Sequence, residues 1–252
     1  MQIEDSVALV TGGNRGIGEA LVRAFVAAGA KRVYAGARSK ESAEHLVAES
    51  PERVVALQLD VTDAASIARA ASLCPDVTIL VNNAGQFHQQ TLLGAPDLSF
   101  ARSEMEVNYF GPLAMCRAFA PVLARSKASA IANVLSAGAI VASPVMGGYS
   151  PSKFAARAMS ACLRAELADQ GTVVTALIVG SVDTRMAAHV KGGKERPETI
   201  ATAALNAIRR GAAEVDTDPM AVEVRAAMIR EPEALARGMA RLLKAKEINT
   251  GR

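Results

Sequence analysis

The feature that most constrains this chain is the regular alternation of short apolar runs with helical segments. The run Val7–Val10 is apolar throughout, and apolar residues then recur at 17, 21, 25 and 26, which is the spacing of one helix face. Further runs predict strands at 32–37, 54–59, 77–81, 130–135 and 173–179, with helices at 42–49, 64–72, 100–125 and 152–169 between them. Because these runs are apolar on both faces, they are typical of a parallel sheet covered by helices on both sides. Right-handed crossovers then predict an α/β fold with a doubly wound sheet.

The pattern loosens after Thr184. The segment 185–198 contains glycines and a proline, and is predicted to be a mobile or briefly helical segment on the substrate side of a site. A helix at 198–210 stopped by Gly211, and a last strand at 213–217, are expected next. Residues 219–252 are expected to form a helical extension, with stretches at 220–229 and 233–245. Its apolar stripe fits a packed helix better than a membrane anchor: Leu235, Met239, Leu242 and Leu243.

Length and composition narrow the class of protein. A chain of 252 residues, of which 50% are hydrophobic, suits a single domain spanning 1–252 with a sizeable core. The net charge of +3 comes from scattered residues, so no nucleic-acid surface is expected. No apolar run is long enough to cross a bilayer, so no membrane partner is expected either.

The cysteines and the N-terminus predict a cytoplasmic protein. Cys74, Cys116 and Cys162 are far apart and odd in number, which favours reduced thiols over disulfides. The acidic start Met1–Asp5 lacks the basic region of a signal peptide. No metal site is expected, because the histidines are isolated: His45, His88 and His189.

A glycine-rich turn lies between the first strand and the first helix. Glycine allows backbone shapes that other residues avoid and lets a pyrophosphate approach the N–H groups of the helix start. The glycine spacing differs from the general dinucleotide fingerprint, and a tight strand–helix turn with no ligand is the alternative. The residues of this turn predicted to bind a cofactor are Gly12, Asn14, Arg15, Gly16, Ile17 and Gly18.

The end of the second predicted strand indicates which dinucleotide is bound. An acidic residue is expected there for NAD, but the sequence reads Gly36-Ala37-Arg38. Arg38, with Arg15 from the glycine turn, is suited to pair with a 2′-phosphate. The predicted cofactor is therefore NADP(H), although Arg38 could also be an ordinary solvated side chain.

A tyrosine and a lysine four residues apart indicate acid–base chemistry. Tyr149 and Lys153 fall on one helix face, and an adjacent ammonium would lower the pKa of the phenol. Ser136 follows the fifth predicted strand, at the sheet edge where ligands bind, and could meet the same substrate oxygen. Such a pair also arises by chance, and Ser136 could be a turn or cap hydroxyl.

The order of these motifs resembles the short-chain dehydrogenase/reductase family, whose fold is Rossmann-type. The match runs through roughly residues 5–184 and rests on the glycine turn, Asp60-Val61, Asn82-Asn83-Ala84-Gly85, Asn108, Ser136 and Tyr149 with Lys153. The resemblance implies that Tyr149 gives or takes the proton, Lys153 lowers its pKa and binds the nicotinamide ribose, and Ser136 holds the substrate oxygen. It implies that Asn108, in the long helix, anchors a water that relays protons; a polar contact inside the helix is the alternative.

The resemblance also assigns cofactor contacts outside the glycine turn. Asp60 would accept from the adenine amino group beside Val61, although Asp60 could instead cap the next helix. The segment Asn82–Gly85, with Asn83 and Ala84, would line the adenine-ribose side. The contacts implied around the nicotinamide are those of Gly180, Val182 and Thr184.

Two departures from the family pattern qualify these roles. Val179 stands where the family usually has proline, which loosens the turn before Gly180. The charged helices at the C-terminus replace a glycine-rich tail that builds tetramers in many relatives. A homodimer through 100–125 and 152–169 is therefore expected, rather than a tetramer.

Together these features predict an NADP(H)-dependent oxidoreductase that acts on a ketone, aldehyde or secondary alcohol. A non-catalytic NADP-binding sensor or scaffold is the rival from another class, and an epimerase or dehydratase on the same fold is the enzymatic rival. The intact set of Asn108, Ser136, Tyr149 and Lys153 argues for catalysis. Segments 87–96, 138–148 and 185–198 are expected to choose the substrate, and their small apolar residues hint at an apolar or aromatic carbonyl.

Overall fold

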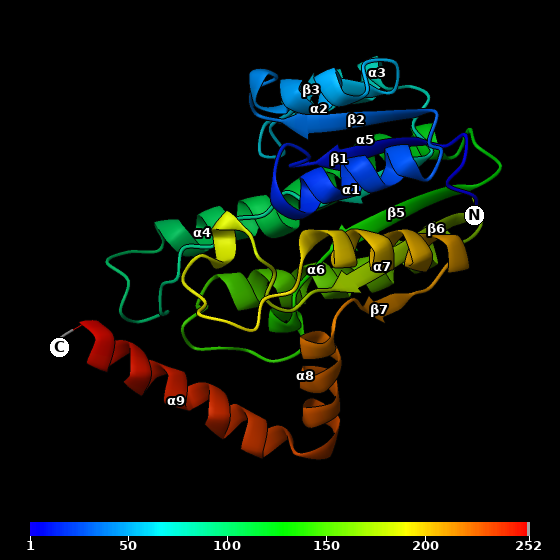
Figure 1. The fold of residues 1–252 in the computed structure, drawn as a ribbon. Coiled ribbons are helices and arrows are strands. Elements are labelled where there is room, and N and C mark those ends of the chain that lie inside the picture. The colour runs from blue at the N-terminus through cyan, green and yellow to red at the C-terminus, as the bar shows by residue number, and fades with distance from the viewer. Residues whose placement is uncertain (251–252) are drawn as a thin grey trace.

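The strands form one parallel sheet in the order β3-β2-β1-β4-β5-β6-β7 (Figure 1). The structure is a computed structural model that describes the backbone of residues 1–250 and the side chains of residues 1–243. The strands are β1 (Val7–Thr11), β2 (Arg32–Ala37), β3 (Val54–Gln58), β4 (Ile79–Asn82), β5 (Ser129–Val134), β6 (Thr172–Ile178) and β7 (Glu214–Asp216). The predicted α/β class with a doubly wound, Rossmann-type sheet is confirmed.

Helices cover both faces of the sheet. The first face carries α1 (Gly16–Ala27), α2 (Glu44–Glu49) and α7 (Pro197–Arg210), and the second carries α3 (Ala64–Leu73), α5 (Gly111–Leu123) and α6 (Tyr149–Glu166). Phe25 fills the first core layer and Phe119 the second, and both side chains are fully buried. Since β1, β2, β4 and β5 pack against helices on both sides, their residues are buried without alternation along the strand.

The chain order places a crevice at one edge of the sheet. From β1 the chain moves outward through β2 and β3, then returns to pair β4 on the other side of β1. Adjacent crossovers therefore leave in opposite directions between β1 and β4, which opens a binding crevice at the carboxyl ends of these strands. The glycine turn, Asp60, the segment 82–85, Ser136 and the segment 180–184 each lie at or directly after the carboxyl end of a strand at this edge.

The long helix predicted at 100–125 is interrupted by a wide turn. It consists of α4 (Ser99–Met105), a π-helical turn at Glu106–Phe110 and α5. Pro112, expected to bend the helix or mark a break, lies at the start of α5 directly after this turn. Proline lacks an N–H, so it is tolerated where the regular hydrogen-bond ladder is already shifted. Short 3₁₀ turns occur at Glu41–Ala43, Ala137–Ala139 and Arg185–Ala187.

The segment after β6 is a loop whose ends are tied together. The Asp183 N–H donates to the carbonyl of Glu195 over 2.8 Å, and the Glu195 N–H donates to the carbonyl of Ser181 over 2.8 Å. A 2.8 Å ion pair joins Lys194 to Asp183. Within the predicted segment 185–198, the helical part is the single turn at Arg185–Ala187 and the start of α7.

Two helices extend the fold beyond β7. They are α8 (Pro219–Arg230) and α9 (Pro232–Thr250), and Figure 1 shows α9 running away from the sheet layers. The apolar stripe on α9 is less covered than expected, since Leu242 is exposed and Leu235 and Met239 are half-buried. The last positions of the predicted extension, 251–252, lie outside the described residues. Among the helices that the structure describes, none is long and apolar enough to cross a membrane.

Candidate active site

The glycine turn forms an open cradle at the start of α1. Gly12 and Gly16 have φ angles of +61° and +56°, which side chains other than glycine rarely adopt. Arg15 is the N-cap of α1, and no side chain caps the helix there. The N–H groups of the first turn have no partner inside a helix, so they can bind an anion.

The end of β4 holds the glycine turn in place. The Asn83 amide nitrogen donates to the carbonyl oxygens of Thr11 (2.9 Å) and Gly12 (3.1 Å). The Thr11 hydroxyl in turn accepts the N–H groups of Asn83 (2.9 Å) and Ala84 (3.0 Å). The adjacent Asn82 donates to the side chain of Asn133 on β5 over 2.8 Å in the core, so both asparagines stabilise the end of β4.

The segment after β6 reaches the same cradle. A Cβ on Gly16 would lie 3.1 Å from Cγ2 of Thr184, so these two predicted cofactor residues are neighbours. Val182, two residues before Thr184, is buried. The Gly180 N–H donates over 2.7 Å to the buried Asp218 carboxylate, which also caps α8. This bond fixes the turn that lacks the usual proline at Val179.

Arg38 is exposed directly after β2, and Asp60 follows β3 at the neighbouring strand end. The Asp60 carboxylate accepts from the N–H (2.9 Å) and hydroxyl (2.7 Å) of Thr62, which lower its pKa; the Arg38 charge adds to this. The N-cap of α3 is Asp63 rather than Asp60. Val61 is buried against Gly111, so most of its side chain belongs to the core.

Tyr149 and Lys153 lie in the first turns of α6, facing the end of β5. The Lys153 ammonium donates to the Val134 carbonyl over 2.9 Å and lies 5.6 Å from the centroid of the Tyr149 ring. Ser136 caps the short turn after β5 by accepting the Gly138 N–H over 3.0 Å. The Ser136 hydroxyl also forms a hydrogen bond with the Tyr149 phenol, so the two hydroxyl groups lie together at the position where a substrate oxygen would bind.

The charges around Tyr149 differ from the expectation. Burial raises the pKa of Tyr149 to about 12, the Ser136 hydroxyl opposes this, and the charge of Glu104 adds to it. Burial also lowers the pKa of Lys153 to about 8. The expected lowering of the tyrosine pKa by Lys153 is absent here, because burial dominates and the ammonium is engaged with Val134. The phenol is therefore protonated at neutral pH, as a proton donor must be.

Asn108 lies inside the π-turn and clamps the segment after β4. Its Oδ1 accepts the Gln86 N–H, and its Nδ2 donates to the Gln86 carbonyl, each over 2.9 Å. Nδ2 also donates to the Ser152 hydroxyl over 2.9 Å, and that hydroxyl donates to the Tyr149 carbonyl over 2.7 Å. The side chain thus positions the start of α6 against the segment after β4.

Three polar residues of this region were missed by sequence reasoning: Ser152, Asp218 and Glu104. Ser152 lies between the recognised Tyr149 and Lys153, and its spacing from Tyr149 could have indicated a bond back to that carbonyl. Asp218 precedes Pro219, a common pattern at a helix start. Glu104 shares a helix face with Asn108, but nothing in the sequence indicates that its carboxyl is buried.

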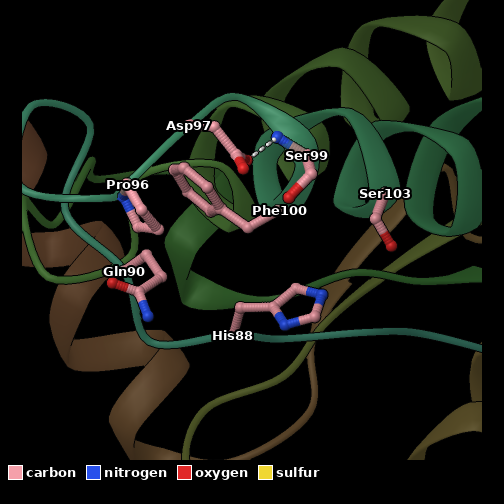
Figure 2. A pocket seen from close by; sticks show the side chains of 7 residues that line it. All are labelled: His88, Gln90, Pro96, Asp97, Ser99, Phe100 and Ser103. Atoms are coloured by element: carbon pink, nitrogen blue, oxygen red, sulfur yellow. Dashed lines mark hydrogen bonds between the residues drawn. The ribbon is translucent and has the colours of Figure 1, made fainter.

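Aromatic side chains border the crevice. The Phe87 ring lies 5.0 Å from the Tyr149 ring and 5.5 Å from the His189 ring, between centroids. A hollow of about 440 Å³ lies between the segment after β4 and the start of α4, lined by His88, Gln90, Pro96, Asp97, Ser99, Phe100 and Ser103 (Figure 2). His45 lies on the surface, 3.5 Å from Glu19. In the part of the chain described, no three His, Cys, Asp or Glu side chains could together hold a metal ion.

Comparisons with known proteins agree with this arrangement. The family model for short chain dehydrogenases matches residues 6–195. A solved short chain dehydrogenase from Burkholderia cenocepacia, in complex with NADP, is 43% identical with a TM-score of 0.89, over 95% of this chain and 99% of that one. A 3-ketoacyl-(acyl-carrier-protein) reductase from Brucella melitensis, complexed with NADH, is 27% identical with a TM-score of 0.78. The match covers 85% of this chain and 95% of that reductase.

A curated relative is the "Dehydrogenase/reductase SDR family member 7B" of Xenopus tropicalis. It is 32% identical over 204 residues, which are 76% of this chain and 65% of the relative's length. The residues matched by the family model include the glycine turn, Ser136, Tyr149 and Lys153. The chain belongs to the short-chain dehydrogenase/reductase family of oxidoreductases.

Proposed function

We propose that this protein is an NADP(H)-dependent carbonyl reductase or alcohol dehydrogenase. The observation that carries the proposal is the meeting of Ser136, Tyr149 and Lys153 at the strand ends beside the glycine cradle. A hydroxyl donor, a protonated phenol and a buried ammonium in one crevice suit proton transfer to a carbonyl oxygen. A sensor or scaffold would need the cradle but none of these groups.

The residues at the cradle fit a dinucleotide. A Cβ on Gly12 would lie 3.1 Å from the Cα of Ala84, so glycine at this position lets the turn pack directly against the segment after β4. The uncapped start of α1 offers N–H donors to a pyrophosphate. Asp60 and Asn83–Gly85 would border the adenosine, and Gly180, Val182 and Thr184 the nicotinamide. The bound cofactor supplies the hydride, and the protein supplies orientation and protons.

Each catalytic side chain has a distinct part in the proposed reaction. Ser136 donates its hydroxyl hydrogen to the substrate oxygen and stabilises the negative charge that develops there. Tyr149 gives that oxygen its proton during reduction, or removes it during oxidation. Lys153 holds the ribose and, with a pKa of about 8, can return a proton to the phenol near neutral pH. Asn108 keeps the start of α6 in register with the segment after β4.

Apolar side chains around the crevice favour an apolar or aromatic carbonyl substrate. Phe87 covers the Tyr149 ring, and the Met146 sulfur lies 3.7 Å from a Cβ built on Gly138. Apolar walls of this kind bind ligands by area and leave orientation to the few polar groups. The direction of reaction proposed is reduction, because the Tyr149 phenol keeps its proton at neutral pH.

We expect Arg38 to select NADPH over NADH. In Arg38→Leu the KM for NADPH should rise by about 10–100-fold, because a charge-assisted bond to a phosphate contributes about 1.5–3 kcal/mol. The KM for NADH should stay close to that of the unmodified protein. Steady-state kinetics with both cofactors measure this.

The matched control for Arg38→Leu is Lys31→Leu. Lys31 is an equally exposed cation at the opposite end of β2, far from the crevice. A general charge effect would change NADPH kinetics in both variants. An equal loss with NADH and NADPH in Arg38→Leu would show that Arg38 does not read the 2′-phosphate.

The assay that tests the proposed function follows nicotinamide absorbance with NADPH and NADH in parallel. A panel of aldehydes, aromatic ketones and diketones serves for reduction, and secondary alcohols serve for oxidation. Turnover with NADPH supports the proposal. Tight NADPH binding with no turnover across the panel would favour the sensor. Conversion of a substrate with no net change in the cofactor would favour an epimerase or dehydratase.

The assembly and cellular setting are further proposals. Exposed Phe110 on the π-turn and Phe154 on α6 support a homodimer through these helices. Sedimentation at increasing protein concentration tests it. A single catalytic domain, a substrate-side role for 185–198 and a cytoplasmic location remain predictions from the sequence.

A further inference from the structure

A buried carboxyl group lies behind the candidate catalytic tyrosine and has no part in the mechanism above. Glu104, on α4, is 1% exposed. Its Oε1 accepts the His88 N–H over 2.7 Å, whereas its Oε2 is buried with no hydrogen-bond partner. A buried carboxylate with an unsatisfied oxygen costs free energy, and burial raises the pKa of Glu104 accordingly. Simple packing would be served better by an apolar residue.

The unpartnered oxygen lies against the residue that precedes Tyr149. A Cβ built on Gly148 would overlap Oε2 of Glu104 and would lie 2.7 Å from the Cα of Ala101. Only glycine therefore lets α4 approach the start of α6 so closely. Because Gly148 is the N-cap of α6, the carboxyl group lies at the helix turn that holds Tyr149.

The neighbouring glycine makes a second close approach on the same side. The Gly147 N–H donates to the carbonyl of Gln90 over 2.8 Å, and a Cβ on Gly147 would lie 2.8 Å from that oxygen. Glu104 holds His88 of the same segment. Glu104 thus joins the segment after β4, the turn 147–148 and α4 into one support for Tyr149.

We propose that Glu104 is a positioning residue for Tyr149 that seats the start of α6 and, through its negative charge, keeps the proton on the phenol. The role rests on the proposed function of Tyr149 as proton donor. It means that this chain is biased toward carbonyl reduction and that oxidation needs a more alkaline medium. Coulomb repulsion between a carboxylate and a phenolate in a low-dielectric site gives this sign.

Among the described residues, no cation forms an ion pair with the Glu104 carboxylate. Lys153, on the same helix, donates to Val134. Ser136, after β5, is neutral, and it opposes the rise in the tyrosine pKa. His189 reaches Tyr149 only through the Phe87 ring. On the Glu104 side, His88 contributes an N–H and a weaker charge effect.

The decisive experiment titrates Tyr149 directly in the unmodified protein and in Glu104→Gln. The chain has three tyrosines and no tryptophan, so no indole absorbance overlaps the phenolate signal. Subtracting the matching Tyr149→Phe protein isolates the signal of Tyr149. Absorbance is read in stopped-flow pH jumps before the chain unfolds. Glutamine still accepts the His88 N–H but carries no charge, so the midpoint should fall by about one pH unit.

The same variant should change the kinetics in one direction. A phenolate midpoint lower by about one unit gives about tenfold more phenolate below it. The rising limb of the pH profile of kcat/KM for alcohol oxidation should therefore move to lower pH. At a fixed pH on that limb, the oxidation rate should rise about tenfold. The rate of reduction at neutral pH should change little. An unchanged or higher Tyr149 midpoint in Glu104→Gln would overturn the proposal.

Two further variants separate the charge from the packing. Glu104→Asp and Glu104→Asn have nearly the same shape and differ in charge, and they replace the first comparison if Glu104→Gln does not fold. The titration midpoint of Tyr149 should be about one pH unit higher in Glu104→Asp than in Glu104→Asn. A merely structural role predicts equal midpoints and a shared loss of stability. If the Glu104 variants shift the Tyr149 midpoint but the Tyr149→Phe protein is fully active, the charge effect stands. That result would show that Tyr149 is not the proton donor.

Discussion

Replacing Tyr149 with phenylalanine is expected to lower kcat for carbonyl reduction by about 10³–10⁴-fold. The change removes one oxygen from a side chain at the start of α6 and keeps the ring that contacts Phe87. General acid catalysis by a positioned group contributes about 10²–10⁴-fold, and here the same oxygen also helps to hold the substrate. The affinity for NADPH, measured by titration of NADPH fluorescence, should stay nearly unchanged, because the substitution does not alter the cradle at Gly12–Gly18.

Tyr34→Phe is the matched control for this loss of a phenol. Its hydroxyl lies on β2 and donates to Asp76 over 3.0 Å, far from the crevice. That variant should lose about 1 kcal/mol of stability, as for one hydrogen bond, and keep its kcat. A Tyr149→Phe protein that keeps kcat within about tenfold would remove Tyr149 as the proton donor.

Gly18→Ala is expected to lose both stability and cofactor binding. A Cβ at this position would overlap the carbonyl oxygen of Gly12 and would lie 2.6 Å from Nδ2 of Asn83. These atoms belong to the cradle and to the bond that ties it to β4, so α1 must move away from the strand. Overpacking of this kind costs about 1–3 kcal/mol. Displacing the helix start also misaligns the N–H groups, so NADPH affinity should fall by about tenfold or more, since each 1.4 kcal/mol is tenfold.

The control for Gly18→Ala is the same substitution at Gly238. A Cβ at Gly238, within α9, would meet no atom within 4 Å. Alanine is the better helix former by about 1 kcal/mol, so Gly238→Ala should keep or raise the melting temperature and leave NADPH binding alone. Thermal melting and a fluorescence titration of both variants make the comparison. Equal NADPH affinity in Gly18→Ala and the unmodified protein would mean that the turn does not hold the pyrophosphate.

The sequence predicts the order of elements well because strand and helix patterns are local. The apolar run at 54–59 ends one residue from the observed β3, and Gly211 ends α7 with a φ of +64°, as the glycine stop predicts. The π-turn at Glu106–Phe110 could not be predicted, because it differs from an α-helix only in which carbonyl each N–H reaches. That choice depends on Asn108 bonding to Gln86 and Ser152, which are distant in sequence.

The pKa values of Tyr149 and Lys153 could not be predicted from the sequence either, because they also depend on segments that are distant in sequence. The spacing of Tyr149 and Lys153 predicts that an ammonium faces a phenol, and predicts a lowered tyrosine pKa. The folded chain buries Lys153 beside the Val134 carbonyl and leaves Tyr149 half-buried, and desolvation raises the pKa of Tyr149 to about 12 instead. The burial of Tyr149 and Lys153 depends on every element that packs around them, whereas the sequence motif contains only these two residues.

By itself, the sequence determined the doubly wound class, the glycine turn and the residues that follow the ends of β4, β5 and β6. These features depend on residue type and on spacing within one segment, which hydrophobic burial and backbone sterics convert directly into local structure. The tertiary structure alone decided that Asp218 secures Gly180, that Asn108 clamps Gln86, and that Glu104 is buried behind Tyr149. Each of these is a contact between distant segments. Burying a polar group costs free energy unless it finds a hydrogen-bond partner, and only the complete fold brings these partners near.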